Sequence, residues 1–562
     1  MQNGFGSLRV VLVGALAAAV SVAGIGASTV AAGAASAGNY VAVGANPVPG
    51  MSSNFTLVGH DPLYDRGMNA AMANYDHYMY IGNRTDAAGA HAANHPGVLV
   101  VDIANPASPQ NVGEIPQPAE LTAGYTSREL RVWPQQKALM VIYFGCSSIL
   151  HACASQSDIT GLQPLQQVSF FDLSKNPANP TLLATYKPST TPHEMFLWLD
   201  PVNSARAFMY WTSPNNSTDS LVVTDISQWR TGVFPEVARF TEIPAFQAAN
   251  IDGTAYDLRL HSLSVTPDGR RAYLAHLGGG FLMLDTSDIA RGAATPTLRA
   301  ITPAANRAYW DNQGAHSSVK IPGKPYAITT EEKYGKGVVL NQAFGDGLGG
   351  CPWGWMRVID IHDETKPKIV AEYKLPQNDA GFCAGADTFT QNYTSYASHN
   401  PTVTPNVAFV TWHSGGLQAI SISNPLKPAQ AGYFLPTPEA IVGQEDPALN
   451  FGPDQNNKVT AWSYPIIRNG LIYFVDIRNG LYVVKYTGPG AAGVSRIKFL
   501  EGNSSAGDAA RLDGYSPLKL AFARITDTVA AVPGAPGVGL SVTALLAALL
   551  YFARAWRRRP GV

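Results

Sequence analysis

A short strand-like motif recurs along this chain of 562 residues and limits the folds that are open to it. Each copy is an apolar run, often preceded by Gly and usually ended by Asp. The copies end at Asp102, Asp172, Asp225, Asp285, Asp360, Ser421 and Lys485. Neighbouring copies therefore stand 53 to 75 residues apart. Self-similarity of this kind is typical of folds that repeat one supersecondary unit.

Each repeated unit reads as four short strands. In residues 263–275 a strand, a tight turn at Asp268-Gly269 and a second strand precede the motif, and a fourth strand follows it. One such unit cannot bury both of its faces alone. Seven of them therefore predict an all-β, seven-bladed β-propeller over residues 38–502. Residues 54–59 and residues 495–500 both read as the strand that closes the ring, and the sequence does not choose between them.

Both ends of the chain read as targeting segments rather than as parts of the fold. Residues 1–37 hold one basic residue, an apolar run and a small-residue site at 35–37, which predict a cleaved signal peptide. Residues 503–534 read as a linker, and residues 535–559 as a transmembrane helix with a basic tail. Because such arginines stay on the cytoplasmic side, we expect an exported propeller that its C-terminal helix anchors to the membrane or cell surface.

The composition of the chain limits which kinds of partner it can bind and indicates the redox compartment in which it folds. Charged residues make up 14% of the chain and the net charge is −1, which argues against a nucleic-acid partner, and we expect a monomer. Four cysteines fit an exported chain. Pairing of Cys146 with Cys153 and of Cys351 with Cys383 is favoured among three connectivities, with four free thiols as the alternative.

Four histidines occupy the same place in successive units. His193, His261, His316 and His399 each stand just before the first strand of a unit. Three of them lie six residues before a proline in the next turn, which supports the alignment independently of the histidines. The corresponding position is Asn69 or a neighbour in the first unit, Arg128 or Glu129 in the second, and Trp462 in the last.

The propeller topology predicts that these histidines meet at one end of the central channel. The first strand of each blade lines that channel, and the loops that enter it emerge on one face. His276 and His413, before the third strand of their units, and Glu331 should lie at the same face as additional ligands or supporting groups. Glu129, Glu194 and Glu331 are candidates to accept the second N–H of a ligating imidazole.

Convergent imidazoles are typical of a transition-metal site. Four nitrogens with open axial positions suit copper or iron, and zinc is a further option. Two alternatives stay open: hydrogen bonds within each blade without metal, and direct binding of an anion by the histidines.

Two resemblances accompany the repeat. The Gly97-Val-Leu-Val-Val-Asp102 type of motif resembles the LVIVD repeat of secreted bacterial propellers and covers most of residues 60–490. Residues 409–417, followed by Ile422-Ser-Asn-Pro-Leu-Lys-Pro428, are similar to a stretch of the selenium-binding protein family. That resemblance covers one blade and implies a link to methanethiol oxidases, which are copper-dependent.

These observations predict a membrane-tethered propeller with a histidine-lined metal site. We expect it to act as a copper- or iron-dependent oxidoreductase on a small substrate. The alternative is a non-catalytic cell-surface propeller that binds a protein or a glycan. The sequence assigns no catalytic base.

Overall fold

The computed structural model describes most of the propeller and leaves both ends of the chain aside. The described residues are 40–45, 48–86, 94–119, 124–146, 153, 167–213, 220–241, 244–245, 259–310, 314–332, 353–379, 381, 396–445, 458–516 and 519–520. The signal peptide, the transmembrane segment, Cys351 and Cys383 lie outside them. Within those ranges, none of the helices combines the length and the apolar character needed to cross a membrane.

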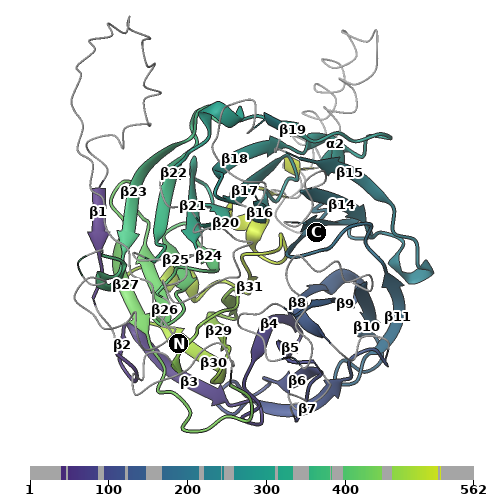
Figure 1. Ribbon diagram of the computed structural model, residues 1–562, viewed down its shortest axis with the longest axis vertical. Coiled ribbons are helices and arrows are strands. Elements are labelled where there is room, and N and C mark those ends of the chain that lie inside the picture. Colours follow the sequence, from purple (N-terminus) through teal and green to yellow (C-terminus); the bar gives the residue numbers. More distant parts are fainter. Residues whose placement is uncertain are drawn as a thin grey trace, which may run out of the picture. The chain divides into compact units, whose positions relative to one another are not determined.

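The fold is a β-propeller in which four-stranded antiparallel blades follow one another in a ring (Figure 1). A single pair, Asn83 with Ser127, links the first two blades edge to edge. These two blades consist of β4 (Asn69–Tyr75), β5 (Tyr78–Asn83), β6 (Val98–Asp102) and β7 (Gln110–Ile115), then β8 (Tyr125–Trp133), β9 (Ala138–Gly145), β10 (Gln167–Asp172) and β11 (Thr181–Tyr186).

The next three blades repeat this order. They are β12 (Met195–Leu199), β13 (Ala207–Thr212), β14 (Leu221–Asp225) and β15 (Glu236–Phe240); β16 (Arg259–Val265), β17 (Arg271–Leu277), β18 (Gly280–Asp285) and β19 (Arg299–Ala300); and β20 (Ala315–Lys320), β21 (Tyr326–Glu331), β22 (Met356–Asp360) and β23 (Lys368–Lys374). Helical segments among the described residues are short: η3 (Pro134–Gln136), η4 (Trp229–Thr231), α2 (Ser287–Arg291), η5 (Ala304–Asn306), η7 (Pro376–Asn378), α4 (Ala491–Val494) and α5 (Ala509–Leu512).

The N-terminal part of the chain closes the ring. The remaining blades are β24 (Pro401–Val403), β25 (Val407–Thr411), β26 (Leu417–Ser421) and β27 (Ala429–Phe434), then β28 (Ile466–Arg468), β29 (Leu471–Asp476) and β30 (Gly480–Tyr486). The outer strand of the β28–β30 blade is β3 (Phe55–Asp61), which pairs with β30. Of the two closing strands that the sequence left open, the N-terminal one therefore takes the outer position. Two further N-terminal strands, β1 (Tyr40–Val43) and β2 (Ser52–Ser53), flank β23 and β27.

The aspartate that ends the repeated motif forms the turn after the third strand. In each case a carboxylate oxygen accepts the N–H two residues further on, at 2.7 Å for Asp102, 2.8 Å for Asp225 and 2.9 Å for Asp285. Short polar side chains that bond their own backbone in this way favour turns over continued strand. The motif is therefore both a buried strand and its stop signal.

Apolar side chains pack between neighbouring blades rather than at one centre. Trp198 and Phe208 of one blade, for example, join Leu263 and Leu274 of the next in one buried cluster. Residues of the β4–β7 blade and of the β28–β30 blade share a cluster in the same way. The first and last blades are therefore in contact and the ring is closed. Both faces of each blade are covered, which is why third strands such as β6 and β18 read as nearly continuous apolar runs.

Residues 499–516 fill one end of the channel, although the sequence predicts a linker from 503 on. β31 (Phe499–Leu500) pairs with β28, and the N–H of Leu197 in β12 donates to the carbonyl of Asn503 at 3.1 Å. The hydroxyl of Tyr515 donates to Asp268 at 2.9 Å, in the turn between β16 and β17. Glu501, Asn503 and Ser504 are buried. The expectation of a linker is therefore wrong for residues 503–516.

Candidate metal centre

The four predicted histidines stand where the inner strand of each blade bulges. The register of β16 shifts between Leu260 and Ser262, and that of β20 between Ala315 and Ser317, so His261 and His316 are the extra residues. The backbones of His193 and Glu194 both bond to Thr212, and those of His399 and Asn400 both bond to Thr411. In each case two residues of the inner strand lie opposite one residue of the next strand, as in a β-bulge. A bulge re-aims one side chain, here toward its counterparts in the other blades.

Five histidines form a continuous row: His193, His261, His316, His399 and His413. Ring centroids are 4.6 Å apart for His193 and His261, 4.1 Å for His261 and His316, and 4.0 Å for His316 and His399. His413 continues the row 4.9 Å from His399. The Nε2 atoms of His193 and His261 are 2.9 Å apart. That distance fits a hydrogen bond, and it also fits two neighbouring ligands of one ion at about 2 Å each.

Two glutamates lie against this row. Glu194 Oε1 is 3.8 Å from His261 Nδ1 and 3.6 Å from His316 Nε2. Glu332 reaches His316 Nε2 at 3.6 Å, His399 Nε2 at 3.4 Å and His413 Nε2 at 3.8 Å. Glu194 with His261 and His316, and Glu332 with His316 and His399, are two buried groups whose ligand atoms all lie within 4.8 Å of one another. Either group could hold a metal ion.

Neighbouring polar groups fix which imidazole nitrogen faces the cluster. His399 Nδ1 is 2.8 Å from the carbonyl of Trp462, which only accepts, so Nδ1 carries the proton and Nε2 keeps its lone pair. His316 Nδ1 lies 2.7 Å from the hydroxyl of Ser317, which donates to Asn400 Oδ1 at 3.2 Å and can therefore accept from the imidazole. Both Nε2 atoms are thereby available as metal ligands.

Three buried nitrogens make no hydrogen bond of normal geometry: His261 Nδ1, His316 Nε2 and His399 Nε2. A buried polar atom left in this way costs on the order of 1–3 kcal/mol. A cation in either three-ligand group would satisfy His316 Nε2 together with one of the other two. The donor set of imidazoles and carboxylates therefore fits a transition metal better than it fits a hydrogen-bonded core.

Threonines of the second strand hold the backbone of the row across blades. The hydroxyl of Thr212 donates to the carbonyl of His261 at 2.8 Å, and that of Thr411 to the carbonyl of Trp462 at 3.1 Å. The hydroxyl of Thr330 donates to the carbonyl of His399 in the same way. Each bulge is thus fixed by the preceding blade, which keeps the histidines in place without any ion.

Burial sets the charge state of the row. It lowers the pKa of His261 to about 3 and that of His413 to about 3, and it holds the pKa of His316 well below 6.5. These imidazoles are therefore neutral at pH 7, as a metal ligand must be. Burial also opposes ionisation of Glu332, but the imidazoles of His316 and His399 outweigh it and keep its pKa well below 4.5. Burial, with the charge of Glu129 second, raises the pKa of Glu194 to about 8.

Some predicted residues do not join the row. The carboxylate of Glu331 pairs with Arg357 at 2.5 Å and accepts from the indole of Trp310 at 3.1 Å, so the interacting glutamate is its neighbour Glu332. Adjacent residues at a strand end point to opposite faces, and a one-residue error in register selects the wrong one. His276 is buried in β17 but belongs to neither three-ligand group.

A buried polar layer that includes Tyr464 and Arg131 lies next to the histidines. The hydroxyl of Tyr464 lies 3.1 Å from Ser262 Oγ and 2.9 Å from Ser317 Oγ. Arg131 pairs with Glu129 at 3.0 Å and donates to the carbonyl of Asn503 at 3.3 Å. The carboxylate of Glu129, which was expected to accept a histidine N–H, therefore pairs with Arg131 instead. Together with residues 499–516, this layer separates the histidines from the other end of the channel.

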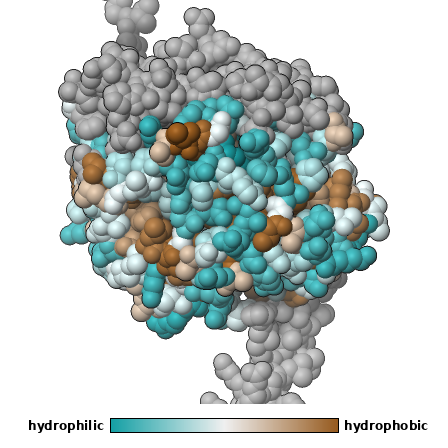
Figure 2. Space-filling view, turned by 90° about the horizontal axis from the view of Figure 1, so that it is seen from below, coloured by the Kyte–Doolittle hydropathy of each residue, from teal (hydrophilic) through white to brown (hydrophobic). Residues whose placement is uncertain are grey.

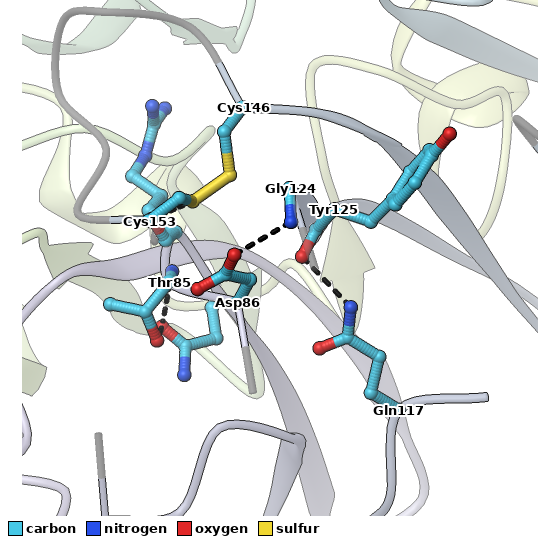
Figure 3. The surroundings of a disulfide bond; sticks show 9 residues. Thr85, Asp86, Gln117, Gly124, Tyr125, Cys146 and Cys153 are labelled. Carbon is cyan, nitrogen blue, oxygen red and sulfur yellow. Dashed lines mark hydrogen bonds between the residues drawn. A yellow bond between two sulfur atoms is a disulfide. The ribbon is translucent and has the colours of Figure 1, made fainter. Parts of the chain in front are cut away.

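Cys146 and Cys153 form the predicted disulfide beside the second blade (Figure 3). Cys153 Sγ lies 3.8 Å from the carbonyl of Arg84, and the N–H of Gly124 donates to Asp86 at 2.6 Å. The guanidinium of Arg84 lies 4.0 Å above the ring of Trp462, which stacks on His413. The disulfide therefore stabilises the chain beside an arginine that approaches the histidine row.

Comparisons with known proteins do not assign the chain to a family. No protein-family model matches it, and no curated protein matches its sequence. Periplasmic gluconolactonase PpgL of Pseudomonas aeruginosa is 13% identical, with 72% of this chain and 94% of that chain covered and a TM-score of 0.42. The Cps50 (Swd1) β-propeller domain of Myceliophteria thermophila is 8% identical, with 77% and 99% covered and a TM-score of 0.38. At these TM-scores, the propeller assignment rests on the strand pairing of this chain. The resemblances to LVIVD-repeat and selenium-binding proteins stay predictions.

Proposed function

We propose that this chain is an exported, membrane-tethered, seven-bladed propeller that binds one transition-metal ion and acts as an oxidoreductase on a small substrate. The observation that carries the proposal is the set of three buried imidazole nitrogens without normal hydrogen bonds, interleaved with two carboxylates. The two carboxylates lie 3.4 to 3.8 Å from these nitrogens, a spacing that leaves room for an ion between them.

The donor set favours iron, then copper, with zinc third. Each three-ligand group consists of two histidines and one glutamate, the combination typical of non-haem iron sites with open positions. Both groups depend on His316 Nε2, whose single lone pair binds one ion at a time, so we propose a mononuclear site. Iron or copper bound there would supply redox chemistry and activation of a substrate. The chain itself contributes oriented imidazoles, an ionised Glu332, and a Glu194 that can take up or release a proton near neutral pH.

Elemental analysis of the full chain, produced in medium that contains iron, copper and zinc, tests the proposal. We expect about one metal ion per chain, and its loss from the double variant His261→Ala/His399→Ala without loss of the β-sheet circular dichroism spectrum. His362→Ala is the matched control, because His362 is exposed and, within the described part of the chain, lies against Asp360 and Tyr326. Wild-type protein that stays metal-free and takes up none of the three metals would exclude the proposed function.

The alternative, a non-catalytic propeller that binds a protein or glycan, predicts a large exposed aromatic patch. Among the described residues the exposed large aromatics are Tyr40, Tyr64 and Tyr309, which lie on separate blades. The surface in Figure 2 is mainly hydrophilic, with small separate apolar areas. Tethering is tested separately: deletion of residues 535–562 should move the protein from the membrane fraction to the medium.

A further inference from the structure

In two blades the bulged histidine is followed by a buried serine that contacts the same tyrosine. Ser262 follows His261 and Ser317 follows His316, and their hydroxyls lie 3.1 Å and 2.9 Å from the hydroxyl of Tyr464. Tyr464 is 5% exposed and stands two residues before β28. One side chain from the β28–β30 blade therefore connects the inner strands that position two candidate metal ligands.

The direction of each hydrogen bond around Ser317 follows from its neighbours. The amide nitrogen of Asn400 donates to the carbonyl of Trp462 at 2.9 Å, so the amide oxygen faces Ser317 and accepts its proton at 3.2 Å. A hydroxyl has one proton and two lone pairs. Ser317 Oγ therefore accepts from its other two neighbours, Nδ1 of His316 at 2.7 Å and the phenol of Tyr464 at 2.9 Å. These three bonds use every site on the hydroxyl and require His316 to carry its proton on Nδ1.

The phenol of Tyr464 acts as a donor at neutral pH. Burial, followed by the charge of Glu194, raises its pKa above the usual value for tyrosine, so the hydroxyl keeps its proton. Ser317 receives this proton because its own is directed to Asn400. The lone pairs of the phenol oxygen then remain for the hydroxyl of Ser262. Tyr464 is thereby held by one blade while it donates to the next.

The C-terminal segment supports the ring of Tyr464. A Cβ on Gly502 would come within 2.6 Å of Tyr464 Cδ1 and within 2.0 Å of the carbonyl oxygen of Pro401. Contacts this short leave no room for a side chain at residue 502, which is a common reason for glycine where a backbone closely approaches another group. The tyrosine ring therefore packs directly on the backbone of residues 499–516, while its hydroxyl bonds to the two serines.

We propose that Tyr464 is a positioning residue of the metal centre. Its hydroxyl fixes Ser317 so that Ser317 accepts the Nδ1 proton of His316 and leaves Nε2 for the ion. Without that hydroxyl, Ser317 Oγ keeps a free lone pair and is held from two sides instead of three, so His316 is directed less precisely. Both three-ligand groups contain His316, so the effect reaches the ion whichever glutamate binds it. This inference rests on the proposed metal site and adds a residue to it.

Zn²⁺ affinity of the full chain, measured by competition with a chromophoric chelator, tests the proposal in a double-variant cycle. Ser317→Ala should weaken binding about ten- to hundredfold, as is typical when the partner of a ligating histidine is lost. Tyr464→Phe should weaken it about two- to tenfold, the range that one hydrogen bond supplies. The double variant should bind no more weakly than Ser317→Ala, because Tyr464 acts through Ser317. Ser317→Thr, which keeps the hydroxyl, should bind close to wild type.

Tyr80→Phe is the matched control for the loss of a buried phenol. The hydroxyl of Tyr80 donates to the carbonyl of Pro177 at 2.8 Å, in the first blade, and this variant should bind Zn²⁺ like wild type. The absorption spectrum of bound Co²⁺ reports the geometry of its ligands. It should change in Tyr464→Phe and stay unchanged in Tyr80→Phe, whereas a merely structural role would lower the stability of both variants and leave both spectra alike.

The outcomes separate this inference from the proposed function. Additive losses of affinity in the cycle, or a wild-type Co²⁺ spectrum in Tyr464→Phe, overturn the positioning role while the metal site stands. If wild type takes up no metal, the proposed function fails, and nitrogen NMR of the metal-free chain with ¹⁵N-labelled histidine still tests the geometry. His316 should then carry its proton on Nδ1 in wild type and partly on Nε2 in Tyr464→Phe; the same tautomer in both overturns the inference. If Tyr464→Phe fails to fold by circular dichroism, Ser262→Ala, which removes the other partner of the phenol, takes its place.

Discussion

Metal binding should depend on pH through one glutamate. Glu194 is the group beside the row that is protonated at pH 7, because burial and the charge of Glu129 raise its pKa to about 8. The imidazoles of His261 and His413, with pKa values of about 3, are already neutral, and Glu332 is already ionised. A cation that uses Glu194 as a ligand must displace its proton.

The size of the effect follows from the pKa. With a pKa of about 8, Glu194 is ionised in roughly one molecule in a hundred at pH 6 and in about half at pH 8. Apparent metal affinity should therefore rise about fiftyfold over this range and level off above it. In Glu194→Gln the amide resembles the neutral acid and cannot ionise. That variant should bind metal more weakly at pH 8, with no such rise.

Competition between the metal-free full chain and a chromophoric chelator for Zn²⁺, at several values between pH 6 and 9, measures this dependence. Zinc avoids redox changes during the titration. Glu501→Gln is the matched control, since Glu501 is another buried glutamate with a raised pKa but lies in the segment that fills the far end of the channel. The reasoning fails if wild type shows no rise, or if Glu194→Gln keeps the wild-type slope.

Three further outcomes follow from the same structure. Thr212→Val, which removes the hydroxyl that donates to the carbonyl of His261, should destabilise the protein by about 1–3 kcal/mol in urea unfolding, whereas Thr212→Ser should not. Arg131→Met should lower the free energy of unfolding by about 3–5 kcal/mol, because it leaves Glu129 buried without its partner. Adding Glu129→Gln to this variant should restore part of the lost stability. If the two substitutions instead destabilise the protein additively, the ion pair does not contribute. The metal-free protein should lose stability as the pH falls from 6.5 toward 3, because the histidines of the unfolded chain take up protons before buried His261 and His413 do. The loss should reach up to about 1.4 kcal/mol per pH unit for each of the two histidines. A free energy of unfolding that does not change over this range would contradict the prediction.

The sequence predicted those parts of the molecule that the repeat encodes. The motif ending at Asp225 or Asp285 is a strand followed by an aspartate-stabilised turn, and both features are local. The spacing between His261 and the following turn at Asp268-Gly269 is also a local feature. Because equivalent positions in the blades of a propeller face the same axis, the convergence of the histidines could be predicted from the topology. The fate of residues 499–516 could not be predicted in this way. Their partners, such as Leu197 and Asp268, are more than two hundred residues away, and the segment itself belongs to no repeated pattern.

The error about Glu129 has its physical origin in the bulge of β8. Because a bulge adds one residue to the inner strand, side-chain direction changes there, and alternation along the strand no longer tells which of Arg128 and Glu129 faces the ring. The register resolves this in favour of Arg128. When all blades are aligned on their bulges, the bulged residues occupy equivalent positions around the ring. The side chains at these positions differ between blades, and these differences decide which groups can bind a ligand. Imidazoles that share one ion need to be adjacent, and successive blades provide that.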